Sequence, residues 1–480
     1  MSDALREHVF KEKASFHTPG HKGYAWQSDG SFTALPALKY DLTELPGLDE
    51  LGCPTGVIQG LEKRAAEAWG AQSTLLSVSG ATAGIIATTL MLVGRGTHLL
   101  VPRNCHRSVI HGLVLSGLEP IWFEPKWESE WGLWGAPDTA QLSEMLKDLF
   151  AKNQNVTSCK VRIAGMFITS PTYTGALADI EWLSDICSIY KIPLLVDEAW
   201  GEHLYWTEQN KQAALDSGAS IVIHSLHKTL SCPTQTGLVH ISKKGAQEYG
   251  FSESELRACM NLIQSSSPNY IFMGAIDKLV LALSSGKAQE QIHRVEELGK
   301  RIKDFFSKTI DLSSYESHSG NALTHFLIKH KDYDPKKLQD LLIGKGIFPE
   351  MPAGLGLLFL LGIGSQTSDI VKLEMALKEI IAVLPKDSKP LSSNNGEPKE
   401  SISKPREIDQ AMNPRKAFFM PSHIVSTKEA IGQISAECLA PCPPGWAILV
   451  PGQRITEEIL AFENIKSVRI VKTDSQFNNV

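Results

Sequence analysis

The chain has 480 residues, of which 42% are hydrophobic and 21% are charged. Its 47 basic and 53 acidic residues give a formal net charge of −6, which excludes a polybasic protein that holds nucleic acid by charge. A chain of this length supports roughly three domains and can bury a core without disulfides or a structural metal. Its eight cysteines include no CxxC pair, so we expect no disulfide framework, no metal site and a reducing, cytoplasmic location.

The N-terminal segment is polar and charged, and it lacks the apolar stretch of a secretory signal. The longest apolar runs along the chain reach about half the length that a bilayer span requires. We therefore expect no membrane segment.

Short apolar runs alternate with helical patterns between about residues 70 and 245. The predicted strands are, in chain order, 75–79, 98–102, 119–124, 162–169, 193–197, 221–225 and 237–242. This alternation predicts a doubly wound α/β domain with a mostly parallel sheet. Such a sheet binds its ligands at the carboxyl ends of the strands.

The pattern changes along the rest of the chain. Residues 285–384 combine longer helices with apolar strands, which predicts a second, smaller α/β domain after a large domain over 1–284. Residues 385–416 are rich in Pro, Ser and charge, which predicts a flexible linker. Residues 417–480 then form a C-terminal module.

A lysine directly follows the predicted strand 221–225, in the sequence SLHKTLSCPTQTG. Lys228 is flanked by Ser225 and His227, and it lies where the strand opens into the ligand-binding face. A lysine in this place can form a Schiff base with an aldehyde cofactor. For a lysine taken alone, a solvated surface position is the alternative.

Asp197 ends the predicted strand 193–197, in the sequence PLLVDEAW. In isolation this residue reads equally well as a helix cap. With Lys228 one strand further on, it suggests a carboxylate that faces the ring nitrogen of pyridoxal 5′-phosphate (PLP). At about 4 Å and an effective dielectric near 20, such a pair is worth roughly 4 kcal/mol, which would keep the ring protonated as an electron sink.

Two further strand ends carry candidate cofactor contacts. The sequence SVSGATAG places Gly80, Ala81 and Thr82 at a helix N-terminus, where backbone N–H groups can bind phosphate. Packing alone also explains many Gly-rich turns of this kind. His106, in RNCHRS, follows another strand, and its flat imidazole can stack on a cofactor ring or be structural.

Together these motifs resemble the Orn/Lys/Arg decarboxylase family of fold-type I PLP enzymes, in a short form without the N-terminal wing domain. The motifs that carry the resemblance are FHTPGHKG (16–23), DLTELPGLDELGCPTGVI (41–58), SGATAG, PRNCHRS, SPTYTG (170–175), VDEAWGEH (196–203), SLHK, SSSPNY (265–270) and APCPPGWAILVPGQ (440–453). The resemblance implies an aspartate aminotransferase-like large domain, a small α/β domain and PLP as the cofactor.

The resemblance also implies roles for individual residues. Lys228 becomes the Schiff-base lysine, Asp197 the partner of the pyridine nitrogen, and His106 the ring-stacking residue. The other implied cofactor contacts are Gly80, Ala81, Thr82, Thr172, Trp200, Ser225 and His227, with Trp200 also a candidate for the substrate. The SSSPNY segment is expected to reach the active site of a neighbouring subunit, which implies a homodimer or a higher homo-oligomer.

The implied reaction is the decarboxylation of a basic L-amino acid (arginine, lysine or ornithine) to an amine, which leads towards polyamines. Lys228 or His227 supplies the proton that replaces the carboxylate, and the sequence leaves both open. An aminotransferase would share Lys228 and Asp197 but normally adds an arginine that clamps the substrate carboxylate. A non-catalytic regulator of the same fold is a third interpretation, against which the intact set of Lys228, Asp197 and His106 argues.

A basic substrate needs a carboxylate beside its distal cation, because an unpaired buried charge is costly. Glu437 directly precedes the C-terminal motif and is our candidate for this contact. The alternative is an ordinary glutamate on the surface of a helix.

Overall fold

The computed structural model describes residues 1–11, 36–154, 161–309, 311–331, 333–383, 404–405, 407–440, 445–461 and 465–472. The FHTPGHKG motif and most of the predicted linker lie outside the described residues. The chain divides into two units, the first formed by Met1–Met91 and Val196–Arg294 and the second by Leu92–Leu195 and Val295–Val480.

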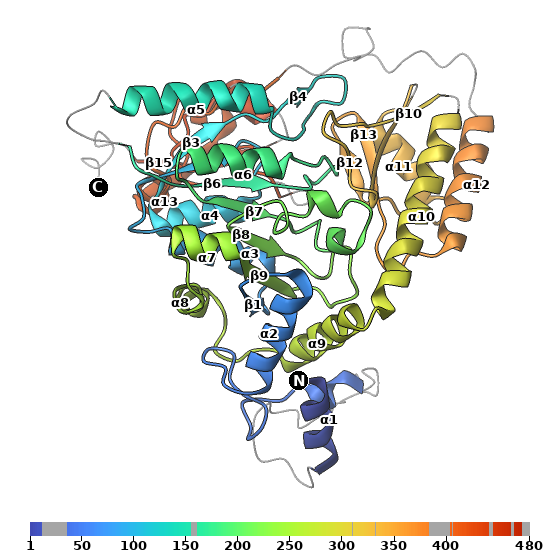
Figure 1. Ribbon diagram of the computed structural model, residues 1–480. Helices are drawn as coiled ribbons and strands as arrows, with labels where there is room; N and C mark the ends of the chain where they lie inside the picture. Colours follow the sequence, from blue (N-terminus) through green and yellow to red (C-terminus); the bar gives the residue numbers. More distant parts are fainter. Residues whose placement is uncertain are drawn as a thin grey trace, which may run out of the picture. The chain divides into compact units, whose positions relative to one another are not determined.

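The first unit is built on three strands, β1 (Ser73–Ser77), β9 (Gly237–Ile241) and β8 (Ile221–His224). β9 lies between the other two and runs antiparallel to both, with His240 opposite Thr74 and opposite Val222. The helices of this unit are α1 (Ser2–Lys11), α2 (Val57–Trp69), α3 (Gly80–Met91), α7 (Lys243–Tyr249), α8 (Glu253–Ile263) and α9 (Tyr270–Ser284). Its described residues also form short turns of 3₁₀-helix, η1 (Pro36–Tyr40), η2 (Leu204–Trp206) and η3 (Asn210–Gln212). Figure 1 shows α2 beside α9.

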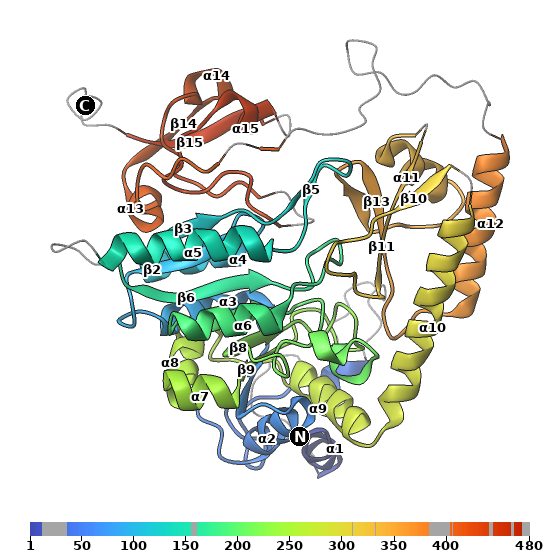
Figure 2. The same cartoon turned by 45° about the horizontal axis from the view of Figure 1, so that its top comes forward.

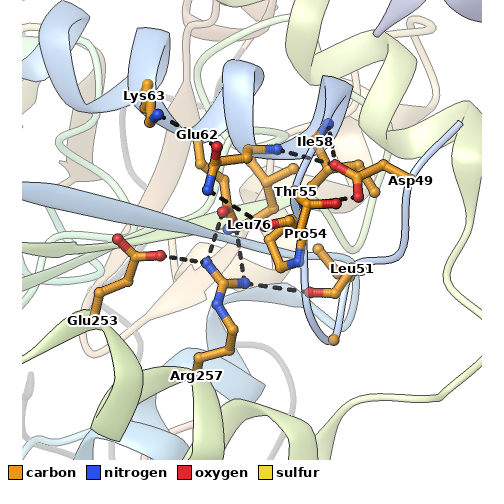
Figure 3. Close-up of polar contacts among 12 residues, drawn as sticks. Asp49, Leu51, Pro54, Thr55, Ile58, Glu62, Lys63, Leu76, Glu253 and Arg257 are labelled. Carbon is orange, nitrogen blue, oxygen red and sulfur yellow. Dashed lines mark hydrogen bonds and ion pairs between the residues drawn. The ribbon is translucent and has the colours of Figure 1, made fainter. Parts of the chain in front are cut away.

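The segment before α2 is folded around the carboxylate of Asp49 (Figure 3). Asp49 Oδ1 accepts the N–H of Thr55 at 2.9 Å, and Oδ2 accepts those of Gly56 at 2.7 Å and Ile58 at 3.0 Å. Although partial burial acts to raise the pKa of Asp49, backbone donors, those of Thr55 and Gly56 first, outweigh it and lower that pKa. The side chain thereby satisfies N–H groups at the start of α2 that have no acceptor within the helix.

A buried ion pair joins α8 to α2 (Figure 3). Arg257 Nη2 lies 2.7 Å from Oε2 of Glu62, which is 4% exposed, and 2.8 Å from Oε1 of Glu253. The second oxygen of Glu62 accepts the N–H of Leu76, at 3.2 Å, on β1. Arg257 Nη1 also donates to the carbonyl of Leu51, at 3.2 Å, in the loop before α2.

The second unit contains the parallel part of the sheet. β2 (His98–Pro102) lies between β6 (Ile163–Thr169) and β3 (Glu119–Phe123) and runs parallel to both. β2 and β6 are almost wholly buried, which explains why each reads as a continuous apolar run. The other elements here are α4 (Arg107–Ser116), α5 (Thr139–Gln154), α6 (Ile180–Ile189) and the hairpin of β4 (Trp127–Glu128) and β5 (Leu133–Trp134). β7 (Leu194–Asp197) spans the boundary between the units.

The small domain is a four-stranded antiparallel sheet covered by helices. Its strand order is β10 (Leu312–Ser314), β11 (His325–His330), β13 (Gly356–Leu360) and β12 (Met351–Ala353). The helices are α10 (Lys287–Lys308), α11 (Pro335–Ile343) and α12 (Thr367–Val383), and Figure 2 shows α10 and α12 side by side. A common hydrophobic core includes Phe306 from α10, Ile328 from β11 and Leu377 from α12. The boundary between the two units falls within α10, after Arg294, and the predicted start of this domain at residue 285 stays a prediction.

The C-terminal module pairs β14 (Ser422–Ser426) with β15 (Ser467–Val471) and carries α13 (Pro414–Phe419), α14 (Thr427–Ala430) and α15 (Glu457–Ala461). It extends into the segment that composition assigns to the linker. The N–H of Ala411 donates to the carbonyl of Gly452 at 3.0 Å, and Asn413 caps α13. The module therefore begins before residue 417, and the described part of 407–416 belongs to it.

The predicted strands of the large domain agree with the observed ones to within two residues at each end. The direction of β9 differs from a simple alternation of strands and helices, because a short loop rather than a crossover helix joins it to β8. Within the described ranges, the chain forms no helix that is both long and apolar enough to cross a membrane.

Candidate active site

Lys228 and Asp197 both belong to the first unit, at the ends of successive strands. β7 ends at Asp197, and β8 ends four residues before Lys228. The Lys228 ammonium lies 4.2 Å from the centre of the Trp200 ring, where the aromatic face attracts a cation. Trp200 is itself buried. The structure thus brings together three of the residues that the resemblance assigns to the site.

The carboxylate of Asp197 is held in an environment that disfavours its charge. The residue is 3% exposed, and burial raises its pKa, while Lys228 and the N–H of Ala199, 3.2 Å from Oδ1, lower it in part. A buried carboxylate of this kind gains most from a cationic partner. The protonated ring nitrogen of PLP fits that requirement.

The N-terminus of α3 lies against the loop that carries Lys228. The N–H of Gly80, the first residue of the helix, donates to the carbonyl of Gln235 at 2.7 Å. A Cβ added at Gly237, the first residue of β9, would stand 2.8 Å from the carbonyl O of His224 and 3.1 Å from the N atom of Ala81, so this close approach requires glycine. The next N–H groups, of Ala81 and Thr82, have no acceptor within the helix, which suits a phosphate.

Ser225 and His227 lie in the same loop. Ser225 Oγ is 3.2 Å from Nδ1 of His227, a half-buried imidazole. Burial, and then the adjacent Lys228 charge, lower the pKa of His227, so the ring is neutral at neutral pH.

His106 belongs to the second unit and begins α4. Its Nδ1 lies 2.7 Å from Ser108 Oγ and accepts the N–H of Ser108 at 3.3 Å. The C-terminal motif packs on this imidazole: a Cβ added at Gly445 would stand 2.6 Å from His106 Nε2. Gly445 also has a φ of 83°, and its carbonyl accepts the N–H of Arg107 at 2.8 Å. These contacts explain why the motif has glycine at this position.

Thr172, also in the second unit, is 4% exposed and structurally engaged. Its Oγ1 accepts the N–H of Ala176 at 3.0 Å and lies 3.3 Å from Thr174 Oγ1. These contacts fix the turn of the SPTYTG motif, and its contact with a cofactor stays a prediction.

Glu437 lies in the C-terminal module, where its carboxylate has a backbone partner. Its Oε1 accepts the N–H of Arg469, on β15, at 2.6 Å. Its own N–H donates to Ser435 Oγ at 3.2 Å. These contacts give Glu437 a structural role within the module, which weakens the prediction that it binds the distal cation of a substrate.

A row of buried polar side chains, from Glu198 directly after β7 across β8 and β9 to β1, was not predicted. Glu198 Oε2 is 2.8 Å from His224 Nε2, His224 Nδ1 is 3.0 Å from His240 Nε2, and His240 Nδ1 is 2.7 Å from Thr74 Oγ1. Burial raises the pKa of Glu198 well above its ordinary value. Burial also lowers the pKa of His224 well below its ordinary value and that of His240 to about 3, so both imidazoles are neutral. The sequence does carry a signal for this row, namely a histidine inside each of the apolar strands β8 and β9, because a buried imidazole needs hydrogen-bond partners.

A second unpredicted group lies beside Lys228. Thr229, the next residue, donates twice to the carboxylate of Glu202, and its hydroxyl also lies 3.0 Å from His203 Nδ1. Glu202 and His203 end the VDEAWGEH motif, but their partner is 26 or more residues further along the chain. In the described parts of the chain, no cluster of three or more His, Cys, Asp or Glu side chains could hold a metal ion.

Comparison with known families bears directly on this arrangement. The family model described as Orn/Lys/Arg decarboxylase, major domain, matches residues 1–332. The chain belongs to the Orn/Lys/Arg decarboxylase family. Decarboxylases of this family depend on PLP. The buried carboxylate of Asp197 and the N-terminus of α3 fit the ring nitrogen and the phosphate of this cofactor.

Individual relatives are similar along almost the whole chain. The uncharacterized protein YaaO of Bacillus subtilis is 29% identical, covering 99% of this chain and 95% of the relative. The arginine decarboxylase of the same organism is 26% identical, covering 95% of this chain and 91% of the relative. The lysine decarboxylase LdcF of Francisella novicida superposes with a TM-score of 0.78 at 17% identity, covering 98% of this chain and 81% of that structure. This superposition confirms the predicted fold class, the fold-type I architecture of PLP enzymes.

Proposed function

We propose that this protein decarboxylates a basic L-amino acid to the corresponding amine, with PLP held by Lys228, Asp197 and the N-terminus of α3. The observation that carries the proposal is the placement of a buried carboxylate and a lysine at the ends of β7 and β8, in a chain of this family. Arginine is the first candidate substrate, because an arginine decarboxylase is similar over 95% of the chain. Lysine and ornithine are the next candidates.

The chemistry replaces a carboxylate by a proton. When bound, PLP supplies an electron sink for the electron pair that stays on Cα as CO₂ leaves. Asp197 contributes the negative charge that the ring nitrogen requires, and Lys228 binds the cofactor. One proton is taken up at Cα, and either the Lys228 ammonium or His227, once it has itself taken up a proton, can deliver it.

Product analysis tests the proposal. The purified protein, loaded with PLP, is offered arginine, lysine and ornithine separately, and CO₂ and organic products are quantified. We expect CO₂ and one amine in equal amounts from at least one substrate. A keto acid in place of CO₂ would indicate an aminotransferase, and a protein that binds no PLP and consumes none of the three would indicate a regulator; either result refutes the proposal.

The proposal includes a homodimer in which SSSPNY (265–270) reaches the partner's active site. The side chains of Ser265, Ser266 and Ser267 are exposed in the described protomer, so they are accessible for contact with a second subunit. Light scattering should give a mass of twice 52.7 kDa or a higher multiple. An active monomer would contradict it.

A cytoplasmic location and a role ahead of polyamine synthesis complete the proposal. They follow from the thiol pattern of the sequence and from the amine product. Cell fractionation and amine analysis after deletion of the gene test them, and an exported protein or unchanged amine levels would contradict them.

A further inference from the structure

Glu202 is a fully buried carboxylate (0% exposed) in the turn after β7. Its Oε1 accepts two hydrogen bonds from Thr229, one from the backbone N–H at 3.0 Å and one from the hydroxyl at 2.7 Å. Thr229 directly follows Lys228, so the N–H that Glu202 binds belongs to the peptide unit that joins the two residues. The carboxylate therefore holds the backbone of the lysine itself.

Both ends of this contact are held in turn. The carbonyl of Glu202 accepts the indole N–H of Trp69, from α2, at 3.1 Å. The hydroxyl of Thr229 has one proton, which it donates to Glu202, so we assign the 3.0 Å contact with His203 as donation from Nδ1–H to the hydroxyl. Burial lowers the pKa of His203 to about 4, which leaves the neutral ring with the one proton that this assignment needs.

We propose that Glu202 is a positioning residue, whose carboxylate fixes the Lys228–Thr229 peptide unit so that the lysine amine meets the cofactor. This inference rests on the proposed function. Lysine has a long, flexible side chain, so the placement of its amine depends on how firmly its backbone is held. A small misplacement of a reacting group can cost about 100-fold in rate.

The charge of Glu202 gives this role a spectroscopic signature. Burial raises the pKa of Glu202 to about 7, against the opposing effects of Thr229 and Lys228. Three further groups face it electrostatically or by contact: the carboxyl of Glu198, the neutral ring of His203 and the thiol of Cys232, whose pKa burial raises to about 12. None of these three groups is a cation, whereas Lys228 is one. An ionised Glu202 therefore stabilises a positive charge on the Lys228 nitrogen.

Two pairs of variants separate positioning from general stability. Glu202→Gln keeps an acceptor at Oε1 and removes the charge, whereas Glu202→Ala removes both. Thr229→Ser keeps both donors, whereas Thr229→Val loses the hydroxyl. Glu208→Gln changes an exposed glutamate six residues after Glu202 along the chain and serves as the matched control. The measurements are PLP affinity of the apoenzyme, the visible absorbance of bound PLP against pH, and kcat and KM.

For Glu202→Ala and Thr229→Val, we expect PLP affinity and kcat to fall by about tenfold or more, with a smaller change in KM. Glu202→Gln and Thr229→Ser should stay within about threefold of wild type, since each keeps both hydrogen bonds between residues 202 and 229, whereas Thr229→Val loses the bond from the hydroxyl. Glu202→Gln should also move the pH midpoint of the visible absorbance to lower pH, because it removes the anion that favours the protonated nitrogen. The control should match wild type in every measurement.

Wild-type PLP affinity and an unchanged absorbance midpoint in both Glu202 variants would overturn the inference. If Glu202→Ala does not fold, Glu202→Gln and the Thr229 pair decide the question by the same measurements. The absorbance and affinity readouts need no substrate. A protein that consumes no basic amino acid but shows these shifts would refute the proposed function alone, and an active enzyme without them would refute this inference alone.

Discussion

Asp197 is a buried carboxylate whose charge is opposed by its surroundings, so its role depends on the cation beside it. We expect Asp197→Asn to retain some PLP but to lower kcat by about 100-fold or more, because asparagine cannot keep the ring nitrogen protonated. Steady-state kinetics at saturating PLP measure this. The matched control is Asp185→Asn, an exposed aspartate of α6, and a kcat for Asp197→Asn within a few-fold of that control would refute the electron-sink role.

The buried imidazoles predict how stability depends on pH. The folded pKa of His240 is about 3, below the value of about 6.5 expected in the unfolded chain, so the unfolded state binds more protons between these values. His240 therefore contributes stability that is present above about pH 6.5 and is lost as the pH falls, by up to about 1.4 kcal/mol per unit.

Chemical denaturation at pH 7.5 and pH 5.5 checks this expectation. The wild type should lose unfolding free energy at the lower pH, and His240→Gln should lose less. His293→Gln, at an exposed position of α10, should behave as the wild type does. An equal loss in His240→Gln and the wild type would place the acid sensitivity elsewhere.

Position relative to a strand end made some site residues predictable and others not. Lys228 and Asp197 follow apolar runs that are legible in the sequence, so their shared edge of the sheet could be inferred. Glu202 could not be assigned, because its partner Thr229 is 27 residues away and meets it only in the folded loop. For Glu437, nothing local reveals that its carboxylate accepts a hydrogen bond from the backbone of Arg469, and its contact with a substrate stays a prediction.

At the scale of elements, the ion pair between α8 and α2 should matter more than the exposed ion pairs of this chain. Arg257→Met leaves the buried Glu62 without its cation, which should lower the unfolding free energy by about 3–5 kcal/mol. Glu253→Gln, which removes the exposed partner of the same guanidinium, should cost about 1 kcal/mol or less.

Denaturant unfolding of both variants tests this difference. The double variant Arg257→Met with Glu62→Met removes both charges and should recover part of the loss. An Arg257→Met variant no less stable than Glu253→Gln would show that the buried pair contributes no more than an exposed one.

Elements were predictable where burial extends over a whole strand. β2 and β6 are buried on both faces, so their apolar runs predicted them closely. The direction of β9 was not encoded in its composition, because an apolar strand looks the same in a parallel or an antiparallel neighbourhood. The two-residue strands β4 and β5 are too short to show any periodicity.

For the whole molecule, bound PLP should add to stability by mass action. A ligand at about 100 times its Kd stabilises the folded state by about 2.7 kcal/mol. We therefore expect the apoenzyme to melt at a lower temperature than the PLP-loaded enzyme, and Lys228→Ala to show a smaller increase on addition of PLP. Differential scanning fluorimetry measures this, and equal increases in both proteins would mean that Lys228 contributes nothing to binding.

The cofactor is expected on one lysine, Lys228, and chemical trapping tests that expectation most directly. Borohydride reduction of the PLP-loaded enzyme makes the link between cofactor and lysine permanent, and mass spectrometry of the digested protein then locates it. We predict a single modified peptide that contains Lys228, and no modification in Lys228→Ala. A cofactor attached to another lysine, or none attached to the wild type, would contradict the account.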